Sequence, residues 1–200
     1  MDQAPQISTV DQACALVRDW FGWKHDLAGS PIALPFAVPQ AIETVNRSFG
    51  RLWLEDPKAC GAVHLFRSQD TLISPHQYQP ESDGVVRMIW ENQGVWGCGF
   101  KPETGAQLWV TGDWPDDLLG SDAWRPTPDV VDTAIIFVLF ANAMWASPYC
   151  ELDEEEEKPP EADRLLFPFA PWEEFRGFWT DCDRSMIRMQ ACIWGLTARR

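Results

Sequence analysis

The apolar run "AIIFVLFA", Ala134 to Ala141, constrains the fold of this 200-residue chain more than any other stretch. It lies inside the segment "PTPDVVDTAIIFVLFANAMWA", which is too long and too apolar to be a single strand. The run is flanked by Asp132 and Asn142 and is too short to cross a bilayer, so we expect no association with a membrane. We therefore predict a helix from about Pro128 to Trp145 that is buried nearly all round.

Two further helices are predicted near the start of the chain. Ser8 or Thr9 can cap the first helix, and Gly22 can end it. Pro39 can occupy the first turn of the second helix, which Gly50 then ends. Apolar residues recur at intervals of three and four, as one helical face requires: Val10, Ala13, Cys14, Val17, Trp20 and Phe21 in the first helix, and Ile42, Val45 and Phe49 in the second.

An antiparallel sheet is predicted in the middle of the chain. Residues Val85 to Trp90 and Val95 to Phe100 are rich in β-branched and aromatic side chains, and a turn joins them into a hairpin. "AQLWVTG", residues 106–112, adds a third strand and extends the hairpin to a meander. "RLWL", residues 51–54, suits one more short strand, whereas residues 67–84 are rich in turn-forming types and predict a loop with one helical turn.

The last quarter of the chain is predicted to extend the same domain. "ELDEEEEKPPEAD", residues 151–163, is read as an acidic surface loop. "PWEEFRGFW", residues 171–179, predicts a short helix, and "MQACIWGLTA", residues 189–198, a last strand. The whole, residues 1–200, is then one α+β domain with a C-terminal helix and strand extension.

Charge favours a basic partner and argues against nucleic acid. The formal net charge is −14, and residues 151–163 hold eight acids and one Lys, a net of −7. A surface of this sign repels phosphate backbones, so direct binding of DNA or RNA is not expected. The acidic segment either mimics nucleic acid towards a basic protein surface or is simply a solvated loop, and the sequence leaves both open.

Known catalytic, metal and cofactor motifs are missing from the sequence. Its three His residues form no H-E-x-x-H pattern, and it has neither a G-x-S-x-G elbow nor a phosphate-binding loop. Six dispersed Cys residues lack a C-x-x-C pair, which favours reduced, buried thiols over a zinc site or a disulfide framework. The first residues do not read as a secretory signal. We expect a cytoplasmic protein that has no cofactor or metal and is not an enzyme.

Tryptophans and aspartates supply the candidate partner-binding surface. Twelve Trp exceed ordinary usage, and such side chains are enriched in binding interfaces. The aspartates of "TGDWPDDLLG" lack the loop pattern of a calcium site, so they are interpreted as a solvated loop beside the aromatic residues. The candidate residues are Trp90, Trp96, Trp109, Asp113, Trp114, Asp116 and Asp117.

The tetrapeptide Glu91-Asn92-Gln93-Gly94 is predicted to form the hairpin turn. Asn and Gly tolerate the positive φ that tight turns need. Glu91 could act instead as a general acid or base if burial raised its pKa, but a turn tip is expected to be solvated. The structural role is therefore favoured over the catalytic one.

Three stretches, in this order, resemble the SUKH superfamily: "LPFAVPQAIETVNRSFGRLW", "LISPHQY" and "MIWENQGVWGCGF", followed by the helix predicted over residues 128–145. The resemblance runs from Leu34 to Trp145, and the acidic segment and the tail from Trp172 lie outside it. It implies an α+β domain with a mostly antiparallel sheet packed against helices and no conserved catalytic machinery.

The same resemblance implies a function in binding. Bacterial members of the superfamily are typically immunity proteins that bind and neutralise a cognate toxin, often a nuclease, and fungal members are scaffolds in cell-wall signalling. An immunity protein for a basic-surfaced toxin domain is therefore expected, with a scaffold for a non-toxin partner as the alternative. Trp90 and Trp96 are expected near a concave face.

Overall fold

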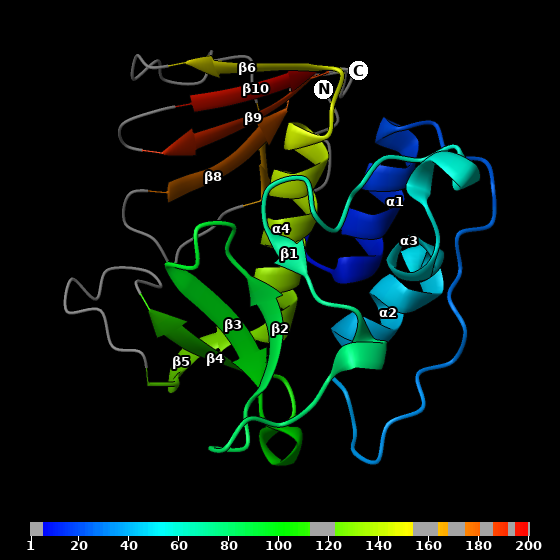
Figure 1. Ribbon diagram of the computed structural model, residues 1–200. Coiled ribbons are helices and arrows are strands. Elements are labelled where there is room, and N and C mark those ends of the chain that lie inside the picture. The colour runs from blue at the N-terminus through cyan, green and yellow to red at the C-terminus, as the bar shows by residue number, and fades with distance from the viewer. Residues whose placement is uncertain are drawn as a thin grey trace.

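The computed structural model describes residues 6–112, 123–153, 164–167, 175–180, 186–191 and 195–199. In this part of the chain, four α-helices accompany two five-stranded antiparallel sheets (Figure 1). The predicted α+β class with a mostly antiparallel sheet is confirmed. Figure 1 shows α4 running from one sheet to the other, with α1, α2 and α3 on one side of it.

Two helices form where the sequence predicts them. Helix α1 spans Val10–Trp20, and Thr9 caps it by accepting a hydrogen bond from the backbone N–H of Gln12. The Gln12 side chain bonds back to the Thr9 N–H, which completes a capping box. Helix α2 spans Gln40–Phe49 and buries one apolar face. Both predicted helices are confirmed.

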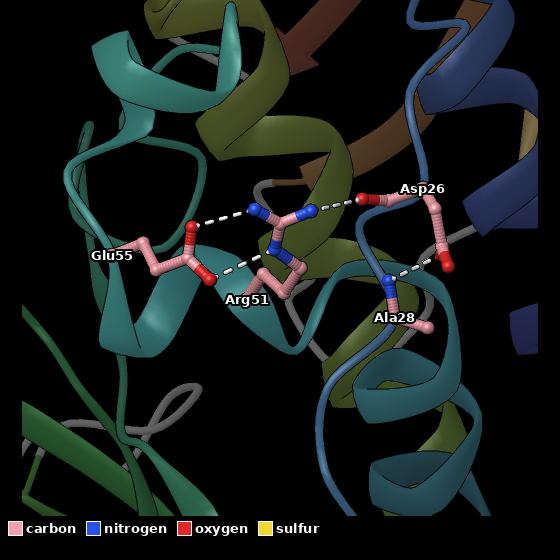
Figure 2. Close-up of polar contacts among 4 residues, drawn as sticks. All are labelled: Asp26, Ala28, Arg51 and Glu55. Carbon is pink, nitrogen blue, oxygen red and sulfur yellow. Dashed lines mark hydrogen bonds and ion pairs between the residues drawn. The ribbon is translucent and has the colours of Figure 1, made fainter.

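Residues 51–54, predicted as a strand, instead form the short helix α3, Arg51–Leu54. Gly50 has a right-handed φ of −58°, so the chain passes from α2 into α3 without the left-handed turn that usually ends a helix. Arg51 and Glu55 then form a two-pronged ion pair with both N–O distances at 2.8 Å, and Arg51 also donates to the Asp26 carbonyl at 2.8 Å (Figure 2). A charge pair at this spacing favours a helical turn.

A close backbone approach fixes the end of α2 against the preceding loop. The carbonyl of Asn46 accepts hydrogen bonds from the N–H groups of both Gly29 and Gly50, each at 2.8 Å. A Cβ added at Gly50 would lie 2.5 Å from the Cα of Gly29, which is closer than real Cβ contacts allow. Gly50 is therefore required for this approach and not for a left-handed cap.

The first sheet has the strand order β1-β2-β3-β4-β5. It includes the predicted hairpin and meander, which are confirmed, and the short β1 within the predicted loop. Its strands are β1 Thr71–Leu72, β2 Val86–Trp90, β3 Trp96–Phe100, β4 Gln107–Gly112 and β5 Arg125–Val130. Three short 3₁₀ helices lie between the elements: η1 Pro57–Cys60, η2 Pro75–Gln77 and η3 Pro102–Thr104.

Helix α4, Val131–Trp145, begins three residues later than predicted. The residues before it form the edge strand β5, where Pro126 and Pro128 are tolerated because an edge strand need not donate every N–H. In α4 only Asp132, Thr133 and Trp145 are not buried, which confirms the prediction of a helix enclosed nearly all round. No helix in the described part of the chain is long and apolar enough to cross a membrane.

The second sheet packs on another side of α4 and was not predicted. Its strand order is β6-β10-β9-β8-β7, with Phe137 and Phe140 of α4 contacting Phe178 of β8 at ring-centroid distances of 6.0 and 5.3 Å. Its strands are β6 Tyr149–Asp153, β7 Arg164–Phe167, β8 Phe175–Thr180, β9 Met186–Ala191 and β10 Gly195–Arg199.

The second sheet corrects three predictions for the C-terminal region, the first of them the acidic loop over residues 151–163, because residues 151–153 pair with β10 as part of β6. Residues 175–179, part of the predicted short helix, lie in β8, because Phe178 and its neighbours pair with β9 in an antiparallel ladder. The single last strand predicted over residues 189–198 is divided between β9 and β10, which pair with each other. Residues 154–163 of the acidic segment lie outside the described residues.

We predict that Gly50→Ala lowers the free energy of unfolding by about 2–4 kcal/mol, because the new methyl group collides with backbone atoms. Gly22→Ala is the control, since Gly22 has nothing within 4 Å of its added Cβ and only its positive φ of 63° to resist substitution. The free energy of unfolding of this control should fall by about 1–2 kcal/mol. Urea denaturation measures both, and equal losses would show that the Gly29–Gly50 approach is not tight.

Candidate protein-binding surface

The pairing of the strands separates the tryptophans between the two faces of the first sheet. Directly paired residues of an antiparallel sheet share a face. Arg87, Gly99 and Trp109 are aligned across β2, β3 and β4, and Trp90 pairs with Gly97 in the next row. Their alternating neighbours, including Cys98 and Val110, are fully buried and point to the core. Arg87, Trp90 and Trp109 therefore lie on the face opposite the core.

We call this set, extended by the residues that contact it, the tryptophan face: Glu81, Arg87, Trp90, Lys101, Trp109 and Trp124. The Arg87 guanidinium lies 4.2 Å from the ring centroid of Trp90 and 5.2 Å from that of Trp124. Glu81 accepts hydrogen bonds from Arg87 Nε at 2.9 Å and from Trp124 Nε1 at 2.8 Å. Cation–π contacts and a shared carboxylate thus fix the two rings around one arginine.

A third cation–π contact, from a second cation, lies elsewhere on the same face. Lys101 Nζ lies 4.2 Å from the ring centroid of Trp109. All three tryptophans of the tryptophan face therefore contact a cation, although the chain as a whole is strongly acidic.

Glycines in β3 make room for these large side chains. A Cβ added at Gly99 would lie 2.6 Å from the Val86 carbonyl oxygen and 2.7 Å from a Val85 methyl group. A Cβ at Gly97 would contact the ring of Trp124 at 3.7 Å. A side chain at position 99 would therefore collide with β2 and the residue before it, whereas at position 97 the absence of a side chain leaves room beside Trp124.

The remaining predicted partner residues do not join this surface in the described structure. Trp96 lies on the core side of β3, where it packs partly buried against the hydrophobic core, so it does not share a face with Trp90. Asp113, Trp114, Asp116 and Asp117 lie outside the described residues. Of the predicted set, Trp90 and Trp109 are placed together.

Four members of this face were not predicted from the sequence: Glu81, Arg87, Lys101 and Trp124. The signal that could have found Arg87 is the alternation of Gly97 and Gly99 in a strand, which marks positions where other groups approach closely. Trp124 and Glu81 lie far from β3 in sequence, and no local pattern connects them to it.

Glu91 is buried, with 8% of its surface exposed, and this corrects the expectation of a solvated turn tip. Its carboxylate Oε2 accepts hydrogen bonds from the backbone N–H groups of Gln93 at 2.8 Å and Val95 at 3.0 Å. The Glu91 carbonyl accepts from the Gly94 N–H at 3.0 Å, and Gly94 has the positive φ expected of a turn residue. Glu91 therefore closes the hairpin turn from the inside.

A second buried carboxyl group, Asp70, supports the turn from the adjacent loop. Its Oδ1 accepts from the Asn92 N–H at 3.3 Å, and its backbone is held by the side chain of Asn142, which accepts from the Asp70 N–H at 2.9 Å and donates to the Asp70 carbonyl at 2.8 Å. Burial, opposed by the Asn92 hydrogen bond and aided by the charge of Glu91, raises the pKa of Asp70 to about 7. The turn thus rests on α4 through Asp70 and Asn142.

The outer part of the turn is exposed and partly apolar. Trp90 is 41% exposed and Val95 is 43% exposed, and the exposed residues Asn92 and Gln93 lie between them in sequence. The Trp90 ring lies 3.5 Å from the position of a Cβ at Gly94, so it folds back along the turn. We call these five residues, 90 and 92–95, the hairpin tip.

Two cysteines are buried in the core and are poorly reactive. Burial raises the pKa of the Cys98 thiol well above its ordinary value and that of Cys14 to about 12, so neither cysteine readily forms a nucleophilic thiolate. Within the described residues, no group of three or more His, Cys, Asp or Glu side chains could hold a metal ion.

Comparisons with protein-family models, with curated proteins and with solved structures found no match to this chain.

Glu91→Ala should lower the free energy of unfolding by about 1–2 kcal/mol, because two turn N–H groups lose their acceptor. Glu91→Gln keeps one oxygen that can accept these hydrogen bonds, so its free energy of unfolding should fall by less. Urea denaturation measures both, with Glu103→Ala as an exposed control that should change little. Unchanged stability of Glu91→Ala would contradict the role given to this carboxylate.

Asp70→Asn should flatten the dependence of stability on pH. Asp70 has a folded pKa of about 7, above the unfolded value of about 4, so the folded state binds the proton more tightly. Its contribution to stability is therefore greatest below about pH 4 and falls as the pH rises to about 7, by about 4 kcal/mol at most.

The measurement is urea denaturation of the wild type and of Asp70→Asn at several pH values from 5 to 8. As the pH rises from 5 to 8, the unfolding free energy of Asp70→Asn should increase relative to that of the wild type by about 2–3 kcal/mol. Asp19→Asn, at an exposed position of α1, is the matched control for loss of one charge. A difference that stays constant with pH would rule out a titrating Asp70.

Proposed function

We propose that this protein is a non-catalytic binding protein, and specifically an immunity protein that binds and neutralises a cognate bacterial toxin. The observation that carries the proposal is Trp90, a large aromatic side chain that is 41% exposed yet held in place. Binding hot spots are enriched in such residues. A fold gains little from leaving this ring in water, whereas a partner gains a large apolar contact.

Trp90 is also prepared for binding by its neighbours. Arg87 lies against its ring at 4.2 Å, and Arg87 is in turn fixed by Glu81 at 2.9 Å. Ordering a long side chain on binding costs about 0.5–1.5 kcal/mol, so a side chain that is already ordered binds at a smaller entropic cost. The hairpin tip then offers one rigid aromatic anchor beside the amides of Asn92 and Gln93, which can donate and accept hydrogen bonds.

The turn beneath the tip supports a binding role over a catalytic one. The two N–H groups that donate hydrogen bonds to the Glu91 carboxylate belong to the turn itself, so this carboxylate already has a structural role. Asp70 is held between Asn92 and Asn142, beneath the tip. These groups stiffen the surface that would meet the partner.

Charge indicates the kind of partner. A net charge of −14 accelerates association with a basic protein through long-range attraction. A nuclease domain fits this expectation, because its substrate groove must attract phosphate. The predicted contribution of Asp113, Trp114, Asp116 and Asp117 belongs to the same proposal.

The resemblance to the SUKH superfamily supplies the biological setting. Its motifs occur in order from Leu34 to Trp145, and this order supports membership and a cytoplasmic place of action. The alternative, a scaffold or regulatory protein with a non-toxin partner, shares the binding role and differs only in what is bound.

The test is affinity purification of the tagged protein from its native cells at low salt and at about 0.3 M salt, which screens weak charge contacts. One stoichiometric partner should survive the salt, and its toxicity with and without this protein then decides its class. A stable homo-oligomer with no toxic partner would favour the scaffold, and only basic proteins lost in salt would contradict the immunity proposal.

Trp90→Ala should weaken binding of that partner by about 2 kcal/mol or more, roughly thirtyfold in Kd, because a central aromatic anchor is lost. Trp145→Ala is the matched control, since Trp145 is similarly exposed at 39% but lies at the end of α4. Isothermal titration calorimetry measures both Kd values. Equal affinity of Trp90→Ala and the wild type would remove the hairpin tip from the interface.

A further inference from the structure

A cleft of about 360 Å³ lies on the helical side of the molecule, away from the residues that form the tryptophan face. It is lined by α3, by η1 and by the loop that precedes β1. This volume is at the lower end of the range for small-molecule sites, roughly 300–1,000 Å³. The cleft is therefore large enough for one small ring and one charged group.

The apolar part of the cleft is fixed in position. The rings of Trp53 and Phe66 are stacked with centroids 4.3 Å apart, and Trp53 Nε1 donates to the Leu72 carbonyl at 2.8 Å. Leu54, also in the lining, is 59% exposed, which is the second highest exposure among the large hydrophobic residues described. A ligand with an apolar body would cover this side chain and rest against a rigid aromatic pair.

The charged part of the cleft favours an anion. Lys58, His64 and Arg67 line it, all three are exposed, and none of their side chains has an acidic partner within the described residues.

Each acid in the lining already serves another group. Glu55 is bonded to Arg51 by two contacts of 2.8 Å, and Asp56 accepts from the Lys58 backbone N–H at 3.0 Å. Lys58 and Arg67 thus form no ion pair within the described residues and lie beside an exposed apolar surface, and the lining also contains the carboxylate of Asp56. This is notable in a chain whose net charge is −14.

We infer that this cleft binds a small organic anion, with an aromatic or aliphatic body on Trp53, Leu54 and Phe66 and a carboxylate or phosphate group at Lys58 and Arg67. The site does not involve the hairpin tip, so it stands independently of the proposed toxin binding. Arg67 can hold either group through two N–H donors, and Lys58 adds a mobile positive charge.

The test titrates the full-length ¹⁵N-labelled protein with benzoate, phenyl phosphate and benzamide while the indole N–H resonance of Trp53 is followed. That resonance is assigned by its loss in Trp53→Phe. Benzoate, phenyl phosphate or both should shift this resonance saturably. Neutral benzamide should bind at least about fivefold more weakly than the anions. Binding of one anion and not the other supports the site and identifies its anionic group.

Variants then locate the charge. Lys58→Gln and Arg67→Gln should each weaken anion binding by about fivefold, whereas Lys24→Gln, at an exposed position outside the cleft lining, should leave it unchanged. The spectra of the variants confirm that they are folded. The inference is overturned if no probe shifts the Trp53 resonance saturably, if benzamide binds as tightly as the anions, or if both variants bind like the wild type.

Discussion

The burial of α4 on all sides is the constraint on which the rest of the structure depends. The helix contacts the first sheet through its apolar side chains, α1 and α2 on a second side, and Phe178 of the second sheet on a third. Burying an apolar side chain of this size contributes about 1.5–3 kcal/mol, so removing any one of these layers would expose several such side chains. Both sheets are thus parts of one core (Figure 1).

One polar residue of α4 connects this core to the proposed binding surface. Asn142 is 1% exposed, and its amide makes three hydrogen bonds to the backbone of Gln69 and Asp70. A buried amide is stable only when its partners are in place, so the loop that holds Asp70 cannot shift without leaving Asn142 unsatisfied. The hairpin turn, which Asp70 contacts through Asn92, takes its position from the centre of the molecule.

Local patterns in the sequence predict the elements that depend on local interactions. The capping box at Thr9, the apolar face of α2, the hairpin and the enclosed α4 are all of this kind. The strand prediction for residues 51–54 is wrong, because these residues form the short helix α3, in which Arg51 pairs with Glu55 four residues along the chain.

What the sequence could not predict depends on long-range pairing. The second sheet consists of short strands whose pairing partners lie in other strands of the C-terminal region, and β5 contains two prolines that usually argue against a strand. The tryptophan face was predicted only in part, because Glu81 and Trp124 meet through a fold that brings together residues 43 positions apart. Trp96, predicted beside Trp90, alternates with Gly97 along β3 and therefore lies on the core side.

In the hairpin turn, the groups that fix the backbone are different from the side chains that are exposed to solvent. Its shape depends on the inward carboxylate of Glu91, on Asp70 and on main-chain atoms, whereas the side chains of Asn92, Gln93 and Val95 point to solvent and accept none of the bonds described for the turn. These three positions can change identity while the backbone keeps its course. Under the proposed function, recognition of a changing partner could therefore alter one residue at a time without any repair of the fold.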